Sequence, residues 1–131
     1  MNWIANVFFH PLFLVGVGGA LGSNLRYGVG YWLNPSTTSF PFPFGTTLVN
    51  VLGSFFLGCI AGMVNDRTQW VYLLVGVGFC GGLTTFSTFS LELVEHLQSG
   101  RAGVAILECV LNVLVGLIAL YAGLWLCKGV T

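Results

Sequence analysis

The sequence predicts an all-α membrane protein with four transmembrane helices, in a single domain that covers residues 1–131. The chain is 56% hydrophobic and only 6% charged, whereas a soluble domain carries about 25% charged residues. So few charges cannot cover a soluble fold, but they suit a chain surrounded by lipid. Since a helix needs about 20 apolar residues to cross a bilayer, four spans nearly fill the chain and leave no room for a soluble domain.

Four apolar runs predict the spans at approximately 12–33, 45–64, 70–97 and 102–127. The short segments between them are polar and contain the Pro, Asn, Ser and Gly residues that favour turns. Tryptophans fall near the predicted ends, as an interfacial aromatic belt would place them: Trp3, Trp32, Trp70 and Trp125. Other polar residues also fall toward span ends, where we expect contact with water: His10, His96, Glu92, Glu95 and Glu108.

The positive charges are balanced between the two sides of the predicted bundle. Four spans place both termini and the middle turn on one side, which carries Arg67 and Lys128. The other side carries Arg101 and, if its side chain reaches that interface, Arg26. Because Lys and Arg bias sets orientation, such a chain has no strong preference. Dual topology, with two copies pairing antiparallel, is the natural consequence. The alternative is that so small a number of charges balances by chance.

The centre of the third span, residues 76–85, is rich in glycine (GVGFCGGLTT). Glycine destabilises a helix interior, so we expect this span to break near its centre. A break frees backbone carbonyls at mid-membrane, which must then be satisfied by a cation, a second subunit or a water-filled cavity. The alternative is an unbroken helix whose glycines serve packing, because G-x-x-x-G pairs let helices approach closely.

Aromatic and hydroxyl residues follow this segment. Phe86 and Phe89 are three apart and can share one helix face, and their ring edges carry partial positive charge that suits a small anion. Ser87 and Thr88 can donate hydrogen bonds beside them. Spacing alone favours the simpler alternative of aromatic packing, with hydroxyls bonded to their own helix.

Polar residues also occur inside the other spans. Asn50 and Asn112 either bond across helices or offer N–H donors to an anion. Arg26 lies within the first span, where charges are functional candidates, although its side chain can also snorkel to the interface. Glu92 would repel an anion, so we place it at a pore mouth or off the pathway.

Other classes of function find no support in the sequence. The net charge is zero, so nothing suggests a nucleic-acid partner. No metalloprotease, phosphate-loop or nucleophile motif is present. We therefore expect a protein that is not an enzyme.

Three segments resemble the signature blocks of the Fluc/CrcB family of fluoride channels, in the same order. They are 18–27 (GGALGSNLRY), 45–55 (GTTLVNVLGSF) and 78–90 (GFCGGLTTFSTFS). The third block is the most specific, and the resemblance extends over essentially the whole chain.

The resemblance implies a passive fluoride channel of the bacterial inner membrane, built as an antiparallel, dual-topology homodimer with two pores. It implies that fluoride contacts Phe86 and Phe89, with Asn50 on the same route and a polar track at Ser87 and Thr88. Two further residues would lie in a vestibule, namely Arg26 and Glu92. Backbone oxygens from both subunits would hold one central structural Na⁺, contributed by Gly81 and Thr84. The fourth span departs from some relatives, since Leu120 stands where they have a hydroxyl residue.

Two alternatives belong to other classes. A small dual-topology multidrug or cation exporter needs a membrane-embedded carboxylate, and the first span contains no Asp or Glu. An accessory subunit that only binds other helices leaves the Phe and hydroxyl cluster without a role.

Overall fold

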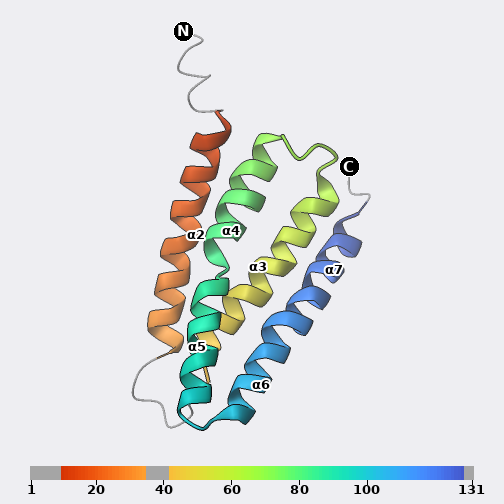
Figure 1. The fold of residues 1–131 in the computed structure, drawn as a ribbon. Coiled ribbons are helices and arrows are strands. Elements are labelled where there is room, and N and C mark those ends of the chain that lie inside the picture. The colour runs from red at the N-terminus through yellow and green to blue at the C-terminus, as the bar shows by residue number, and fades with distance from the viewer. Residues whose placement is uncertain (1–9, 35–41, 129–131) are drawn as a thin grey trace.

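The computed structural model describes residues 10–34 and 42–128, and this part of the chain is helical with no strand. Figure 1 shows the helices running side by side as an elongated bundle. We call the helices that form one predicted span a column. The first column is α2 (Pro11–Leu33) and the second is α3 (Phe44–Met63). The third consists of η1 (Tyr72–Cys80), α4 (Gly81–Leu83) and α5 (Phe86–Gln98), and the fourth of α6 (Ala102–Val110), η2 (Leu111–Val115) and α7 (Gly116–Cys127). The expected all-α class with four helical spans is confirmed. The residues 1–9, including Trp3, and the loop 35–41 lie outside the described part.

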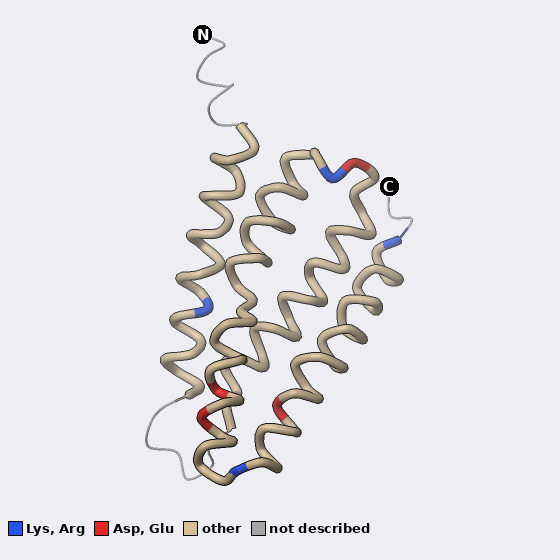
Figure 2. The backbone as a smooth tube through the Cα atoms, in the orientation of Figure 1, with Lys and Arg blue, Asp and Glu red and all other residues tan. Residues whose placement is uncertain are grey.

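Three of these columns are long and apolar enough to cross a membrane: Phe44–Met63, Tyr72–Gln98 and Ala102–Cys127. The remaining helix, α2, has 23 residues and is long enough to cross, but its hydropathy is lower because Ser23, Asn24 and Arg26 interrupt it. Large apolar side chains point outward along the bundle, including Trp32 and Trp125. Figure 2 shows charged positions mostly toward the helix ends. This distribution fits a bundle whose outer surface meets lipid.

Local sequence explains where α2 begins and ends. The side chain of His10 caps its N-terminus by accepting a hydrogen bond from the N–H of Leu12 (3.3 Å), and Pro11 occupies the first turn, where no N–H is needed. At the other end, the Asn34 Oδ1 accepts a hydrogen bond from the N–H of Gly45 (2.7 Å). The same Asn side chain therefore links the end of α2 to the first turn of α3.

Glycines let neighbouring helices meet backbone to backbone. A Cβ added at Gly58 would overlap the carbonyl oxygen of Leu120, and one at Gly123 would overlap that of Phe55, so α3 and α7 approach each other reciprocally. Between α2 and the third column, Gly22 lies equally close to the Phe79 carbonyl. The small-residue positions thus lie at helix contacts, as close packing in lipid requires.

The turn after α3 is held by its own polar side chains. The N–H of Thr68 donates a hydrogen bond to the Asp66 Oδ1 (2.9 Å), which lowers the pKa of this carboxyl below its usual value. Arg67 donates a hydrogen bond to the Tyr72 hydroxyl (2.6 Å) and lies over its ring. This turn, the start of α2 and the end of α7 share one end of the bundle (Figure 1).

The third column breaks near its centre, as expected. α4 ends at Leu83, and the next two residues are extended, with φ/ψ of −81°/154° at Thr84 and −149°/116° at Thr85. The break lies at the C-terminal end of the predicted segment 76–85, since Gly81 and Gly82 are still helical. The glycines also serve packing, because Gly82 lies against the Gly19 backbone of α2.

Candidate functional site

The amide of Asn50 bridges the broken helix. Its Oδ1 accepts a hydrogen bond from the N–H of Thr85 (2.7 Å), and its Nδ2 donates to the Thr85 carbonyl (3.1 Å). Inside a membrane, backbone groups that leave a helix need such partners because no water replaces the lost bonds. The Asn50 Oδ1 therefore replaces the helical acceptor that the Thr85 N–H loses at the break. Its Nδ2 adds a second hydrogen bond to the Thr85 carbonyl, which as part of the N-cap residue also accepts the first hydrogen bond of α5.

Asn112, on the fourth column, extends this network. Its Oδ1 accepts the second hydrogen bond from the Asn50 Nδ2 (2.7 Å). Its own Nδ2 donates to the Thr47 Oγ1 (3.2 Å) and to the Glu108 carbonyl (3.0 Å). The two amides connect α3, the third column and the fourth column, so both Asn residues bond across helices in this structure.

Arg26 reaches the break from α2. Its Nε donates a hydrogen bond to the carbonyl oxygen of Gly82 (3.1 Å), and the Ser23 hydroxyl lies 3.5 Å from the same oxygen. In a continuous helix, this carbonyl would accept from the N–H of Phe86. Arg26 thus compensates the break with part of its guanidinium and does not only snorkel to the membrane surface.

Thr85 caps the second half of the broken helix. Its Oγ1 accepts a hydrogen bond from the N–H of Thr88 (3.1 Å), which is the usual bond of an N-cap residue. The same hydroxyl lies 3.0 Å from the Thr88 Oγ1 and 3.3 Å from the Ser87 Oγ. Three hydroxyls are therefore clustered at the start of α5. Sequence reasoning named Ser87 and Thr88 but missed Thr85, although a Thr before a helix start is itself a capping signal.

The two phenylalanines differ strongly in exposure. Their ring centroids are 5.7 Å apart with an interplanar angle of 63°, an edge-to-face arrangement. The side chain of Phe89 is buried (5% exposed), whereas that of Phe86 is 78% exposed on the single chain. Phe86 therefore presents its ring outside the protomer, where lipid or another chain would cover it.

Two cavities meet at the break. The first, of about 230 Å³, is lined by Asn50, Ser54, Thr85, Phe86, Phe89 and Asn112, among other residues. The second, of about 350 Å³, is lined by Arg26, Thr46, Thr85, Thr88 and Glu92, among others. The structure therefore brings Asn50 together with the two rings, and Arg26 together with Glu92. Thr85 lines both cavities, and Ser87 lies beside them through its contact with Thr85.

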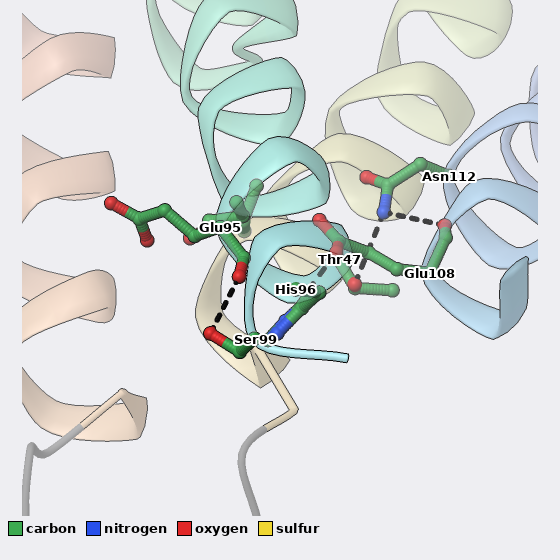
Figure 3. A network of polar contacts seen from close by, with 8 residues as sticks. Thr47, Glu95, His96, Ser99, Glu108 and Asn112 are labelled. Carbon is green, nitrogen blue, oxygen red and sulfur yellow. Dashed lines mark hydrogen bonds and ion pairs between the residues drawn. The ribbon is translucent and has the colours of Figure 1, made fainter. Parts of the chain in front are cut away.

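The acidic residues of the third and fourth columns are less exposed than expected. Glu92 accepts a hydrogen bond from the Thr46 hydroxyl (2.8 Å), and its second oxygen is buried. Glu95 is exposed, as expected, but Glu108 is fully buried (0% exposed) and His96 nearly so (6%). The expectation that His96 and Glu108 contact water was wrong, because the tight turn folds α6 back and each side chain points into the bundle (Figure 3).

His96 and Glu108 form a buried pair. The His96 Nε2 lies 3.7 Å from the Glu108 Oε2, and no donor reaches either Glu108 oxygen in the described part of the chain. The charge of Glu108, when ionised, thus depends on protonated His96 as its close counter-ion. No group of three or more His, Cys, Asp or Glu suited to a metal is found among the described residues.

The carbonyl oxygens expected to hold sodium are released by the break. In a continuous helix, Gly81 and Thr84 would accept hydrogen bonds from the N–H groups of Thr85 and Thr88. Both N–H groups bond elsewhere, to Asn50 and to the Thr85 hydroxyl. Gly81 is exposed, and a Cβ there would meet nothing within 4 Å. Carbonyl oxygens are ligands that suit a hard cation, so these residues fit the expected group.

The fold and the site together define a class of protein. It is a small four-helix membrane protein in which the polar groups of one broken helix line two cavities, as in an ion-transport site. The family model described as "CrcB-like protein, Camphor Resistance (CrcB)" matches residues 13–124. The chain therefore belongs to the CrcB family.

Similar proteins carry the name "Fluoride-specific ion channel FluC". One from Leptospira interrogans is 40% identical over 126 residues, covering 92% of this chain and 97% of the relative. Another from Shewanella frigidimarina is 43% identical, covering 84% and 90%, and one from Klebsiella pneumoniae is 41% identical, covering 90% and 94%. These names describe ion channels, which are neither exporters nor enzymes.

Proposed function

We propose that this chain is the subunit of a fluoride-selective passive channel. The family and the names of relatives about 40% identical over most of the chain support this function over the exporter alternative. The structural observation that supports it best is the first cavity, where an amide and aromatic ring edges meet at the break. As a multi-pass membrane protein with bacterial relatives, the chain belongs to the bacterial inner membrane.

The first cavity offers an anion weak positive partners and no acid. The residues that line it include no Asp or Glu. Phe86 and Phe89 can turn ring edges toward a dehydrated anion, and Asn50 carries N–H donors at the same place. Removing the water around a small anion costs free energy. Several weak hydrogen-bond donors and ring edges together offset part of this cost, and none of them binds fluoride so tightly that it cannot leave.

The second cavity serves as the vestibule in this proposal. Arg26 and Glu92 both line it, so their opposite charges offset each other near the pore mouth. The Glu92 carboxyl accepts the Thr46 hydroxyl hydrogen bond, which holds one of its oxygens to the wall. Arg26 attracts anions into the cavity, and the hydroxyls of Thr85 and Thr88 provide the adjoining polar track, with Ser87 beside them.

The functional unit in this proposal is an antiparallel homodimer with two pores. The exposed ring of Phe86 supports it, because a pore residue that leaves its own protomer needs a second chain to cover it. The positive charges near the helix ends are few, with Arg67 and Lys128 on one side and Arg101 on the other, so the bias is small and supports insertion in both orientations. Each pore would be lined by both chains, and membrane lipid would cover the remaining apolar surface.

A central structural Na⁺ would be held by the carbonyl oxygens of Gly81 and Thr84 from both subunits. Such an ion would attract the carbonyl oxygens, which no longer accept hydrogen bonds within the helix because of the break. The chain itself orients these carbonyls, because Asn50 and the Thr85 hydroxyl engage the N–H groups that would otherwise bond to them.

The mechanism needs no energy source. Uncharged HF crosses membranes and ionises in the cytoplasm, which traps fluoride inside. A fluoride-selective pore lets the ion leave down its electrochemical gradient.

Reconstitution in liposomes tests the proposal. Purified protein is placed in vesicles with a KF gradient, valinomycin is added, and external fluoride is followed with an electrode. Fluoride efflux without chloride efflux is expected; no efflux, or equal chloride efflux, rejects a selective channel. Phe86→Ile and Phe89→Ile are expected to slow efflux while the dimer stays assembled, and loss of the dimer would assign the rings to packing.

A further inference from the structure

One hydrogen-bond donor in the first cavity is bound to another side chain of the same protein. The Thr85 backbone engages the Asn50 amide twice, through the Thr85 N–H and through its carbonyl. This pair of bonds fixes the amide orientation and leaves a single N–H. That N–H is donated to the Oδ1 of Asn112, at 2.7 Å. Asn50 therefore has no uncommitted donor for an anion in this structure.

The orientation of Asn112 is also fixed. Its two N–H groups donate to the Thr47 hydroxyl and to the Glu108 carbonyl (Figure 3). Its oxygen is therefore the atom that accepts from Asn50. Asn112 lies in the π-helical segment η2, and such segments in helices are frequent at functional sites. Asn50 and Asn112 both line the first cavity, together with Phe86 and Phe89.

We propose that the Asn112 oxygen is a placeholder for the permeating anion, because it accepts the hydrogen bond from the one Asn50 N–H that does not bond to Thr85. This inference rests on the proposed fluoride function. When the cavity holds no ion, Asn112 accepts this hydrogen bond; when fluoride arrives, the N–H changes partner from the amide oxygen to the ion. The donor is never left bare at mid-membrane, where an unpaired polar group is costly.

The placeholder weakens fluoride binding by competition. Fluoride has to displace an existing hydrogen bond, so its affinity for this donor is lower than for a free N–H. Conduction requires such a compromise, because an ion that binds too tightly does not leave. Asn112 is thus a residue that tunes fluoride affinity through Asn50, while the Thr85 contacts keep the Asn50 amide in place.

Two substitutions of similar volume separate this role from a structural one. Asn112→Leu removes the competing acceptor, so the fluoride concentration that gives half-maximal efflux is expected to fall about fivefold, the equivalent of one net hydrogen bond. Asn112→Asp strengthens the acceptor and adds a negative charge, so this concentration is expected to rise about tenfold or more. Efflux is measured at neutral and alkaline pH to keep the new carboxyl ionised.

The test depends on direction: Asn112→Leu should lower the half-maximal fluoride concentration, and Asn112→Asp should raise it. Leu114→Ala is the control, because Leu114 lies in the same segment but is exposed and does not line the cavity; it is expected to leave the half-maximal concentration unchanged. Shifts in the same direction for Leu and Asp, or no shift in either, overturn the proposal. If Asn112→Leu does not fold, Asn112→Ala also lacks the acceptor and carries the same prediction. Wild-type vesicles without fluoride efflux would instead reject the channel function itself.

Discussion

Replacing Asn50 by Leu tests whether this amide stabilises the broken helix. Leu has the same number of side-chain heavy atoms as Asn but no hydrogen-bonding group. The substitution removes the acceptor of the Thr85 N–H and the donor to the Thr85 carbonyl. The N–H then lies inside the membrane without this partner, whereas the carbonyl of this N-cap residue keeps the first hydrogen bond of α5. The substitution also removes the donor to the Asn112 oxygen.

The expected loss of stability follows from these contacts. Leaving one buried polar group unsatisfied costs about 1–3 kcal/mol, so the unpaired Thr85 N–H is expected to lower the unfolding free energy by about this amount. Denaturant unfolding of the purified protein in detergent, followed by circular dichroism, gives the difference between Asn50→Leu and wild type. Fluoride efflux is expected to be lost as well, because the first cavity changes shape at the break.

Ser54→Ala is the matched control. Ser54 lies one turn further along α3 and lines the same cavity, but its hydroxyl bonds only to the Asn50 carbonyl of its own helix (2.7 Å). We expect it to change the unfolding free energy by less than about 0.5 kcal/mol. If Asn50→Leu is as stable as this control, the break is held by other contacts and our reasoning about Asn50 is wrong.

Three further predictions concern stability. Gly58→Ala is expected to lower the unfolding free energy by about 1–3 kcal/mol, because the added methyl group overpacks the contact with the Leu120 carbonyl. Gly28→Ala, with open space around it, should have no such effect. Thermal unfolding compares the two variants, and equal losses of stability would refute the close contact at Gly58. Replacing both His96 and Glu108 by Leu is expected to leave stability unchanged or raise it by about 1–4 kcal/mol, while His96→Leu alone should lower it; a destabilised double variant would contradict this. The Asp66 pKa is lowered in the folded state, so its stabilising contribution is present above the ordinary value of 3.8 and is lost as pH falls through the folded-state pKa; an NMR titration that gives an ordinary pKa would disprove it.

The sequence predicts the helices well because their signals are local. Apolar runs and polar turns predicted a first span at 12–33, and α2 covers Pro11–Leu33. The break in the third column was also predicted from glycine content. The prediction covered residues 76–85 and did not single out Thr84 and Thr85, because the exact position depends on which side chains of other helices bond to the released backbone groups.

The site is less accessible to sequence reasoning because its contacts are distant along the chain. Asn50 bonds to Thr85, 35 positions away, and to Asn112, 62 positions away. A single sequence does not show such pairings, so both Asn residues had two open interpretations. Glu108 was misplaced for a related reason: closeness to a turn suggested exposure, but the direction of its side chain is set by how α6 packs against α5. The roles of the pore and sodium residues stay predictions.

Thr85 lines both cavities, and its side chain is held in place. The residue is only 8% exposed, and its hydroxyl accepts the capping hydrogen bond from the N–H of Thr88. Rotation of this hydroxyl away from α5 would therefore break the cap. In the proposed channel, an ion that passes from one cavity to the other would meet a fixed polar wall at this residue, so its passage there would depend on the energetics of dehydration rather than on a moving side chain.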